Sequence, residues 1–245
     1  MIKADVNVVG AFTIDEAWRE VMWLCARNGY DFVIKHGSYK GQIRRQLSEV
    51  MIKIAQPWKR PLAPITPPGY PPPTSEAEIE QYFLNYIMSS EVHGNEDYTY
   101  GKFISPQLPK IIEMLIKSEG NTNQASINIG GVDNVNLDDP PCLRVIDFKV
   151  VEKTLQMSVL FRSWDLYAGM PSNLGGLQLL KEYVLSQIED HIEVTDGAIV
   201  AYSDGLHLYD HWFELANAFN VENDIIVDKH LLNAKKEFNK LLDNK

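Results

Sequence analysis

The sequence predicts a mixed α/β protein of the α+β type, and three observations support this class. Helix-capping signals recur along the chain, and three strand-like segments follow one another in its middle. Of the 245 residues, 45% are hydrophobic and 23% are charged, which is typical of globular proteins with a sizeable core. The length allows one sizeable domain or two small ones, and we expect a single domain over residues 1–245.

The first helix is predicted from the capping box Thr13-Ile-Asp-Glu16 to about Arg27, where Asn28-Gly29 ends it. Cys25 lies on its apolar face and is expected to be a core thiol. A strand follows at residues 30–34, and then a cationic turn at residues 35–40. Residues 42–54 alternate imperfectly and predict one long strand, with Arg44 and Arg45 near its start.

The later elements rest on the same kinds of signal. Residues 57–73 are rich in proline and are expected to run over the surface of the domain. Ser75-Glu-Ala-Glu78 is a second capping box, for a helix to about Ser89. Further helices are predicted at residues 109–117, 174–188, 210–216 and 229–242, and strands at 126–129, 143–150, 155–161 and 199–209, the last with a bulge at Ser203-Asp-Gly205.

Charge and cysteine content restrict the class of protein. The net charge of −10 argues against general binding to nucleic acids or membrane surfaces. Two cysteines, Cys25 and Cys142, give no disulfide framework, so we expect a cytoplasmic protein. No apolar run is long enough to span a bilayer, and the first residues lack the apolar core of a signal peptide.

Cys142 follows two prolines at the start of a predicted strand. It is either a buried strand cysteine or a reactive thiol. A reactive thiol needs partial exposure and a nearby cation to lower its pKa, and Arg144 and Arg162 are the candidate cations.

A strand-to-helix junction further along the chain is dense in polar groups, namely Arg162, Ser163, Asp165 and Asn173. These groups suit a small anionic ligand. Arginine can bind an anion with two N–H groups, serine offers a hydroxyl, and asparagine both donates and accepts.

His207 and Tyr209 point to the same face of a predicted strand, because alternate residues do so. That spacing suits a shared contact to a sugar, and it equally suits a strand edge with an outward aromatic ring. Asp204 and His211 are a weak basis for a metal site, and we expect none. Ser163 lacks the elbow motif of a hydrolase nucleophile.

Three motifs occur in a set order. They are Pro140-Pro141-Cys142, then Arg162-Ser163-x-Asp165 with Met170-Pro171-x-Asn173, then His207-x-Tyr209. Their order and spacing resemble the thymidylate synthase family and its relatives, the pyrimidine hydroxymethylases, over roughly residues 98–212. The run Arg-Ser-Trp-Asp-Leu-Tyr-Ala-Gly is similar to the archaeal branch. The resemblance implies a mixed sheet with helices packed on one side, and a homodimer formed through the sheet.

The resemblance also implies roles for the site residues. Cys142 would add to C6 of a pyrimidine, and its thiolate would be favoured by Arg162. The carbon and the hydride would come from 5,10-methylenetetrahydrofolate, whose binding residues we do not assign. The other roles are phosphate binding by Arg162 and Ser163, base contacts by Asn173 and the backbone near Asp165, sugar contacts by His207 and Tyr209, and active-site positions at Tyr100 and Glu80.

The sequence departs from the family pattern in ways that keep alternatives open. Thr122-Asn123-Gln124-Ala125 stands where the family carries an arginine pair that binds the phosphate of the partner subunit. Lys35, Lys40, Arg44, Arg45 and Arg144 are the cations that would compensate. The tryptophan that usually precedes the Tyr-Gly run is absent before Tyr98, which favours water attack and thus a hydroxymethylase.

The preferred hypothesis is a methyltransferase of the thymidylate synthase type that converts dUMP to dTMP. We prefer dUMP because the amide of Asn173 suits uracil, whereas cytosine-specific relatives carry aspartate there. The first alternative is a hydroxymethylase of dUMP, dCMP or CMP. The second is a non-catalytic nucleotide-binding homologue, suggested by the missing arginine pair.

Overall fold

The computed structural model describes residues 6–218, apart from residues 38, 67–68, 93 and 95. The helix expected at residues 229–242 therefore lies outside the described residues. None of the helices in the described ranges combines the length and apolar character needed to cross a membrane.

Six strands form the main sheet, in the order β1-β4-β9-β7-β6-β5. β1 pairs with β4 in parallel and so does β7 with β9, while the other neighbours are antiparallel, so the sheet is mixed as expected. The strands are β1 Asn7–Ala11, β4 Val50–Ile54, β5 Ser126–Asn128, β6 Leu143–Val151, β7 Thr154–Phe161 and β9 Thr195–Ser203.

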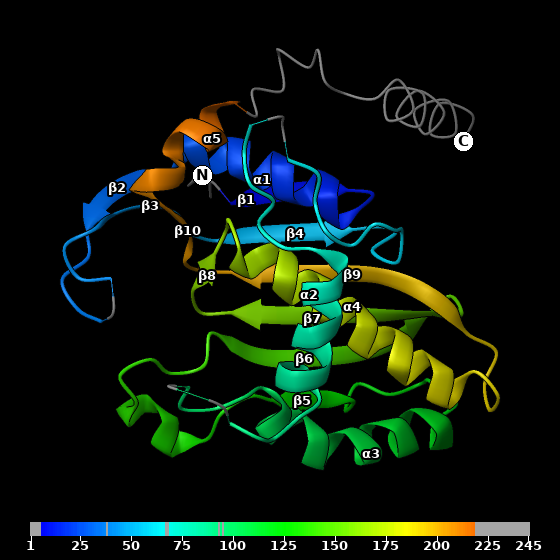
Figure 1. Ribbon diagram of the computed structural model, residues 1–245. Helices are drawn as coiled ribbons and strands as arrows, with labels where there is room; N and C mark the ends of the chain where they lie inside the picture. Colours follow the sequence, from blue (N-terminus) through cyan, green and yellow to red (C-terminus); the bar gives the residue numbers. More distant parts are fainter. Residues whose placement is uncertain (1–5, 38, 67–68, 93, 95, 219–245) are drawn as a thin grey trace, which may run out of the picture.

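Helices cover one face of this sheet (Figure 1). α4 crosses β7 and β9, while α1 and α3 pack beside it, and α2 lies over α4. The opposite face exposes apolar side chains: Val8 is 67% exposed, Met51 42% and Leu160 38%. The helices are α1 Ile14–Asn28, α2 Glu76–Tyr82, α3 Gly101–Lys117 and α4 Gly169–Ile188.

A second sheet of four short strands lies at one end, in the order β2-β3-β10-β8. Its strands are β2 Tyr30–Val33, β3 Ile43–Leu47, β8 Trp164–Asp165 and β10 Leu206–Tyr209. Short helical segments complete the chain, namely η2 Val132–Asn136, η3 Asp210–Trp212 and α5 Phe213–Ala218.

The predictions of one long strand at residues 42–54 and another at 199–209 were wrong. Each stretch forms two strands that belong to different sheets. Leu47 and Val50 are both buried, so the alternation changes phase, and Glu49 between them has a left-handed φ of 55°. The two breaks lie opposite each other, because β3 pairs with β10 in the second sheet and β4 pairs with β9 in the main sheet. The two paired segments therefore pass from one sheet to the other at the same place.

Two helices begin earlier than predicted. α3 begins at Gly101 rather than at residue 109, although Pro106 and Pro109 cannot donate to the helix ladder. Its apolar face compensates, since Ile104, Leu108, Ile111 and Leu115 are all buried. α4 begins at Gly169 rather than at residue 174. Its first turn is held by Asp165, which accepts hydrogen bonds from the backbone N–H groups of residues 167–169.

The second capping box is confirmed at Ser75 and Glu78. Beyond α2 the helix widens into a π-helical turn, η1 Phe83–Ile87, and such turns are frequent at functional sites. This helix lies very close to α4. A Cβ at Gly176 would be 2.7 Å from Ile87 Cδ1 and 2.8 Å from Tyr82 Cδ1, so glycine is needed for the approach. The approach places Tyr82 beside the first turns of α4.

Candidate active site

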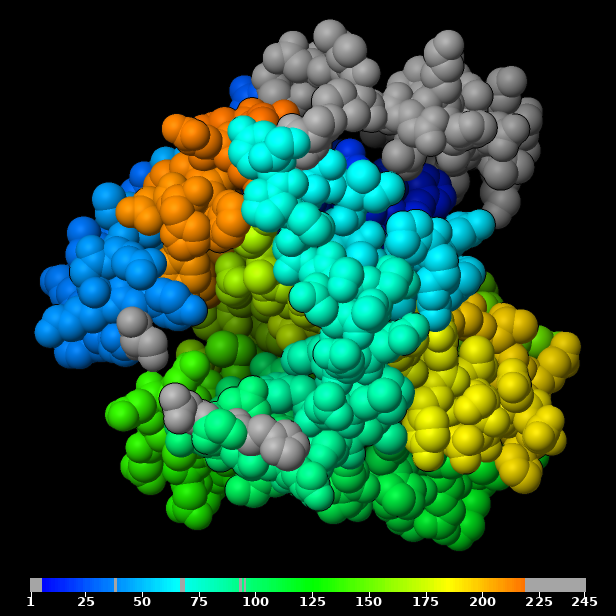
Figure 2. Space-filling model, in the orientation of Figure 1, coloured from blue at the N-terminus to red at the C-terminus, as the bar shows by residue number. Residues whose placement is uncertain are grey.

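Cys142 immediately precedes β6, a strand in the interior of the main sheet. Its backbone carbonyl accepts from the N–H of Arg162 at 2.9 Å, and its side chain is partly exposed. Figure 2 shows the surface hollowed where the yellow-green chain near the start of α4 is set back behind its neighbours. The partial exposure of Cys142 fits the reactive interpretation better than a plain core cysteine.

Arg162 holds the two prolines before Cys142. Its Nε donates to Pro141 O at 3.2 Å, and its Nη2 donates to Pro140 O and to Asp139 Oδ1, the latter at 3.3 Å. The side chain keeps 39% exposure. Guanidinium has five N–H groups, so part of it stays available for an anion.

Electrostatics around the thiol favour a negatively charged ligand. Burial is the largest effect and raises the pKa of Cys142, while Arg162, Arg44 and Arg144 oppose it and Asp139 adds to it. The expected effect of Arg162 thus has the right direction and is smaller than that of burial. Three arginines against one carboxylate leave an excess of positive charge near the thiol.

Four tyrosines form a wall beside Cys142, and three of them were missed in the sequence. Tyr100 accepts from the N–H of Leu143 at 3.2 Å, next to the thiol. Tyr86 stacks on Tyr82 at 5.3 Å and meets Tyr100 edge-on at 5.1 Å, and Tyr98 packs on both Tyr86 and Tyr100. Burial raises the pKa of all four, with Cys142 among the smaller causes. The spacing of Tyr82 and Tyr86, one helical turn apart, was the available signal.

Asn173 lies on α4 and is joined to this wall. Its Nδ2 donates to the hydroxyl of Tyr82 at 2.6 Å, and its Oδ1 accepts from Trp164 Nε1 at 2.8 Å. The side chain is partly exposed. The tyrosines connect Asn173 to the backbone beside Cys142: Tyr82 stacks on Tyr86, and Tyr86 meets Tyr100, whose hydroxyl binds the N–H of Leu143. The residue expected to bind the base and the expected nucleophile therefore lie along one wall.

The Asp165 carboxylate accepts hydrogen bonds from the backbone at the start of α4. Burial raises the pKa of Asp165, and three backbone hydrogen bonds lower it. Its place on β8, opposite His207 in the register of β10, puts the backbone of this segment at the site. Its side chain therefore acts on helix α4 rather than on a ligand.

His207 and Tyr209 lie on β10 with complementary hydrogen-bonding groups. Burial and then Arg44 lower the pKa of His207 to about 4, so the ring is neutral at pH 7. Its Nδ1 donates to Gly205 O at 2.8 Å, since a carbonyl only accepts, which leaves Nε2 as an acceptor. The hydroxyl of Tyr209 accepts from Arg44 at 3.4 Å and keeps its own proton to donate. One acceptor and one donor side by side suit a single hydroxyl group.

Arg44 is the compensating cation that the structure places best. It lies over the rings of Phe32 and Tyr209, at 5.9 and 5.6 Å, and its buried Nε has no hydrogen-bond partner among the described residues. Arg45 is used elsewhere, because it pairs with Asp31 at 2.7 Å and stacks on Phe213. Sequence alone did not separate these neighbours.

The remaining expected residues are placed less tightly. Ser163 is partly exposed in the turn after Arg162. That turn packs on Gly205, where a Cβ would be 3.0 Å from Arg162 O. Glu80 is exposed on α2, and no contact in the described structure joins it to Cys142. Lys35 and Lys40 are exposed in the turn before β3.

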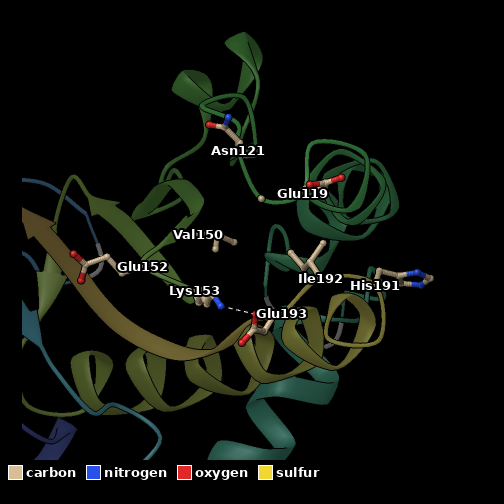
Figure 3. Close-up of a pocket in the computed structure, with 9 residues that line it drawn as sticks. Glu119, Asn121, Val150, Glu152, Lys153, His191, Ile192 and Glu193 are labelled. Carbon is tan, nitrogen blue, oxygen red and sulfur yellow. Dashed lines mark hydrogen bonds and ion pairs between the residues drawn. The ribbon is translucent and has the colours of Figure 1, made fainter.

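Two other hollows lie away from this chemistry. One, of about 490 Å³, lies at the far end of the β6–β7 hairpin and is lined by Val150, Lys153, His191 and Glu193 among others (Figure 3). The strand β6 separates it from Cys142, and the eight steps from Cys142 to Val150 span roughly 26 Å at 3.3 Å per residue. The other, beside α3, includes Asn123 and Gln124. Among the described residues, no group of histidine, cysteine and acidic side chains gathers to hold a metal ion.

Comparison with known proteins identifies the family. The family model described as thymidylate synthase matches residues 84–239, more than half of the chain. This chain belongs to the thymidylate synthase family. The family that matches is the one that the sequence motifs indicated.

Individual relatives are distant. Two archaeal proteins named putative thymidylate synthase are similar. That of Methanosarcina barkeri is 28% identical over 85% of this chain and 92% of its own, and that of Methanococcoides burtonii is 25% identical over 84% and 90%. A solved thymidylate synthase from T4 phage has a TM-score of 0.63 at 14% identity, covering 83% of this chain and 80% of its own. The thermostable thymidylate synthase A of Bacillus subtilis has 0.61 at 15%, covering 84% and 83%. These structures confirm the fold.

Proposed function

We propose that this protein is a thymidylate synthase that methylates dUMP at C5 to give dTMP. The observation that carries the proposal is the wall of tyrosines that connects the backbone beside Cys142, through Tyr100, Tyr86 and Tyr82, to Asn173. It places a thiol and an amide that can bind a pyrimidine edge along one surface. The unused groups of His207 and Tyr209 then suit a sugar hydroxyl, and the surplus of arginines suits a phosphate.

The phosphate would be held by Arg162 and Ser163, with help from Arg44 and Arg144. Each charge-assisted hydrogen bond contributes roughly 1.5–3 kcal/mol. Arg44 and Arg144 act on the thiol from within the same chain. They supply the positive charge that Asn123 and Gln124 lack.

The thiol would start the reaction. Cys142 Sγ bonds to C6, its proton is lost, and the electron pair of C5=C6 moves toward C5 and O4, which makes C5 nucleophilic. After C5 has gained the new carbon, its own hydrogen leaves as a proton and Cys142 is released. Since burial raises the pKa of Cys142, the arginines must promote loss of the thiol proton.

Methylenetetrahydrofolate would supply the carbon and the hydride. The aromatic wall fits a flat pterin ring, because Tyr86 is partly exposed beside Tyr82 and next to Tyr100. The wall also bears on the hydroxymethylase alternative. That alternative rested on a missing tryptophan, and tyrosines occupy the region in front of Tyr100. We therefore favour exclusion of water and a methyl product.

We also propose that two copies pair through the exposed face of the main sheet, as the family resemblance implies. Val8, Met51 and Leu160 supply its apolar surface. Both cysteines are free thiols, which suits the proposed cytoplasmic location.

The proposed function is tested by incubating the protein with dUMP, dCMP and CMP, each with methylenetetrahydrofolate. We expect dUMP to gain about 14 mass units and dihydrofolate to form, whereas a hydroxymethylase would add about 30, as the added atoms require. Cys142→Ser should abolish release of the C5 hydrogen and leave thermal stability nearly unchanged. Nucleotide binding without any C5 hydrogen release by the parent protein would instead support the non-catalytic homologue.

A further inference from the structure

The amide of Asn173 has its orientation determined by Trp164. The indole Nε1–H is a donor with no acceptor capacity, so the atom that it meets at 2.8 Å must be the amide oxygen. Asn173 therefore turns Oδ1 toward Trp164 and Nδ2 toward Tyr82. A flipped amide would set two donors against each other at a site where Trp164 is only 2% exposed.

Tyr82 does not impose this orientation. A hydroxyl donates as readily as it accepts, so Tyr82 would satisfy either end of the amide. The two partners thus have different roles, although both hold Asn173. Tyr82 binds the amide in either orientation, and Trp164 determines which of its two ends is the oxygen.

An amide has two N–H groups and two lone pairs, and Trp164 and Tyr82 use one of each. One donor on Nδ2 and one acceptor on Oδ1 remain, and the partly exposed side chain presents them to the site. Uracil offers an acceptor at O4 and a donor at N3. Cytosine offers the reverse, a donor at its 4-amino group and an acceptor at N3. Each base therefore needs the opposite orientation of the amide.

We propose that Trp164 is a positioning residue that selects uracil over cytosine by locking the Asn173 amide in one orientation. The inference rests on the proposed function, since it takes Asn173 as the group that meets the base. Trp164 is itself held rigidly. It stacks on Phe161 with ring centres 4.0 Å apart and planes 4° apart, and its backbone N–H donates to Gly205 O at 2.9 Å.

The test compares Trp164→Phe with Tyr82→Phe. Both remove one hydrogen bond to Asn173 and keep an aromatic ring. Affinities for dUMP and dCMP are measured by calorimetry, with release of the C5 hydrogen from each as a second measurement. In Trp164→Phe the amide can flip, because Tyr82 then donates to Oδ1. We expect the preference for dUMP over dCMP to fall by about tenfold or more, the scale of one polar mismatch.

In Tyr82→Phe we expect both affinities to fall by a similar factor and the preference to stay within about threefold of the parent, because Trp164 still sets the orientation. A merely structural role for Trp164 would lower both affinities equally, and that result would overturn the inference. A lost preference in Tyr82→Phe would also overturn it.

If Trp164→Phe fails to fold, benzothienylalanine at position 164 keeps the ring shape and replaces only the N–H by sulfur, with the same expected loss of preference. Measurements on the parent protein distinguish failure of the proposed function from failure of this inference. Binding of dUMP without turnover contradicts the proposed reaction and leaves the preference measurable, whereas equal parent affinities for dUMP and dCMP contradict the inference alone.

Discussion

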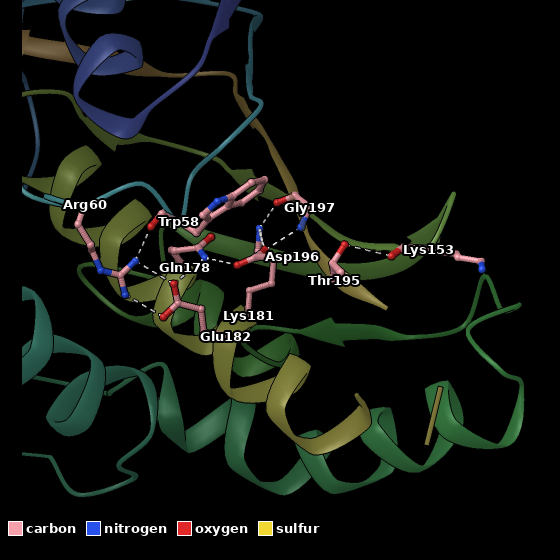
Figure 4. A network of polar contacts seen from close by, with 9 residues as sticks. All are labelled: Trp58, Arg60, Lys153, Gln178, Lys181, Glu182, Thr195, Asp196 and Gly197. Carbon is pink, nitrogen blue, oxygen red and sulfur yellow. Dashed lines mark hydrogen bonds and ion pairs between the residues drawn. The ribbon is translucent and has the colours of Figure 1, made fainter. Parts of the chain in front are cut away.

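Two polar clusters in this protein differ in their balance of charge. The first surrounds Lys181 on α4, which is fully buried and pairs with Asp196 at 2.8 Å (Figure 4). Gln178 donates to Asp196 and Glu182, and Arg60 pairs with Glu182 at 2.9 Å. Two cations face two carboxylates, so the cluster is neutral within itself.

The second cluster, at Cys142, has no such balance of charge. Its charged neighbours are three arginines and Asp139, and Asn173 and His207 each keep free hydrogen-bonding capacity. Each cluster has one buried atom without a hydrogen-bond partner among the described residues, Arg44 Nε here and Gln178 Oε1 in the first. The comparison teaches how the two are distinguished. Balanced charges satisfy one another within the fold, whereas surplus positive charge suits an anionic ligand, as we propose for the second cluster.

The largest expected effect on stability comes from breaking the first cluster. Lys181→Ala removes the cation from the largely buried Asp196 carboxylate and leaves a cavity, and it should lower the free energy of unfolding by about 3–5 kcal/mol. Lys153→Ala is the matched control, because its pair with Glu193 is exposed, and it should cost under about 1 kcal/mol. Urea titration measures both. Similar losses for the two variants would mean that the buried network contributes little.

His207 should make stability depend on pH. Its pKa falls from 6.5 unfolded to about 4 folded, so the unfolded chain binds more protons between these values. Stability from this group is complete above pH 6.5 and is lost as pH falls toward 4, by up to roughly 3 kcal/mol. The difference in unfolding free energy between parent and His207→Gln should therefore shrink on acidification, and a difference that is constant with pH would contradict the burial of a neutral ring.

Substitutions at the adjacent residues Arg44 and Arg45 should distinguish a role in ligand binding from a role in the fold. Arg44→Met should weaken dUMP binding by about tenfold or more and deoxyuridine binding much less, because the lost contact is to the phosphate. Arg45→Met removes the pair with Asp31 and should leave both affinities within about twofold. Calorimetry with nucleotide and nucleoside checks this. Equal losses for dUMP and deoxyuridine would place Arg44 away from the phosphate.

The smallest expected effect concerns the thiol. Because burial raises the pKa of Cys142, its alkylation by iodoacetamide should still be accelerating at pH 9.0. Arg144→Gln should slow the reaction at pH 7 by roughly fivefold, the scale of one unit charge at close range in water. Cys25 is the internal control, since burial raises its pKa to about 12 and it should react far more slowly. A profile that levels off below pH 8 would show that the arginines outweigh burial.

Much of the fold was predictable because its signals are local. The caps at Thr13 and Ser75 and the three central strands were confirmed. The errors arose where tertiary pairing overrides a local pattern. The breaks at Glu49 and Gly205 divide two long strands between two sheets, and the long apolar face of α3 carries that helix through Pro106 and Pro109.

The sequence by itself determined which residues we propose for the chemistry. Cys142, Arg162, Asn173 and the His207-x-Tyr209 pair follow from motif order, because residue type and spacing along the chain are enough to state a resemblance. Tertiary structure alone decided how these groups are placed. The selection of Arg44 over Arg45, the tyrosine wall and the link from Trp164 through Asn173 to Tyr82 join segments far apart in the chain. Hydrogen bonds depend on distance and direction in space, and separation along the sequence contains neither.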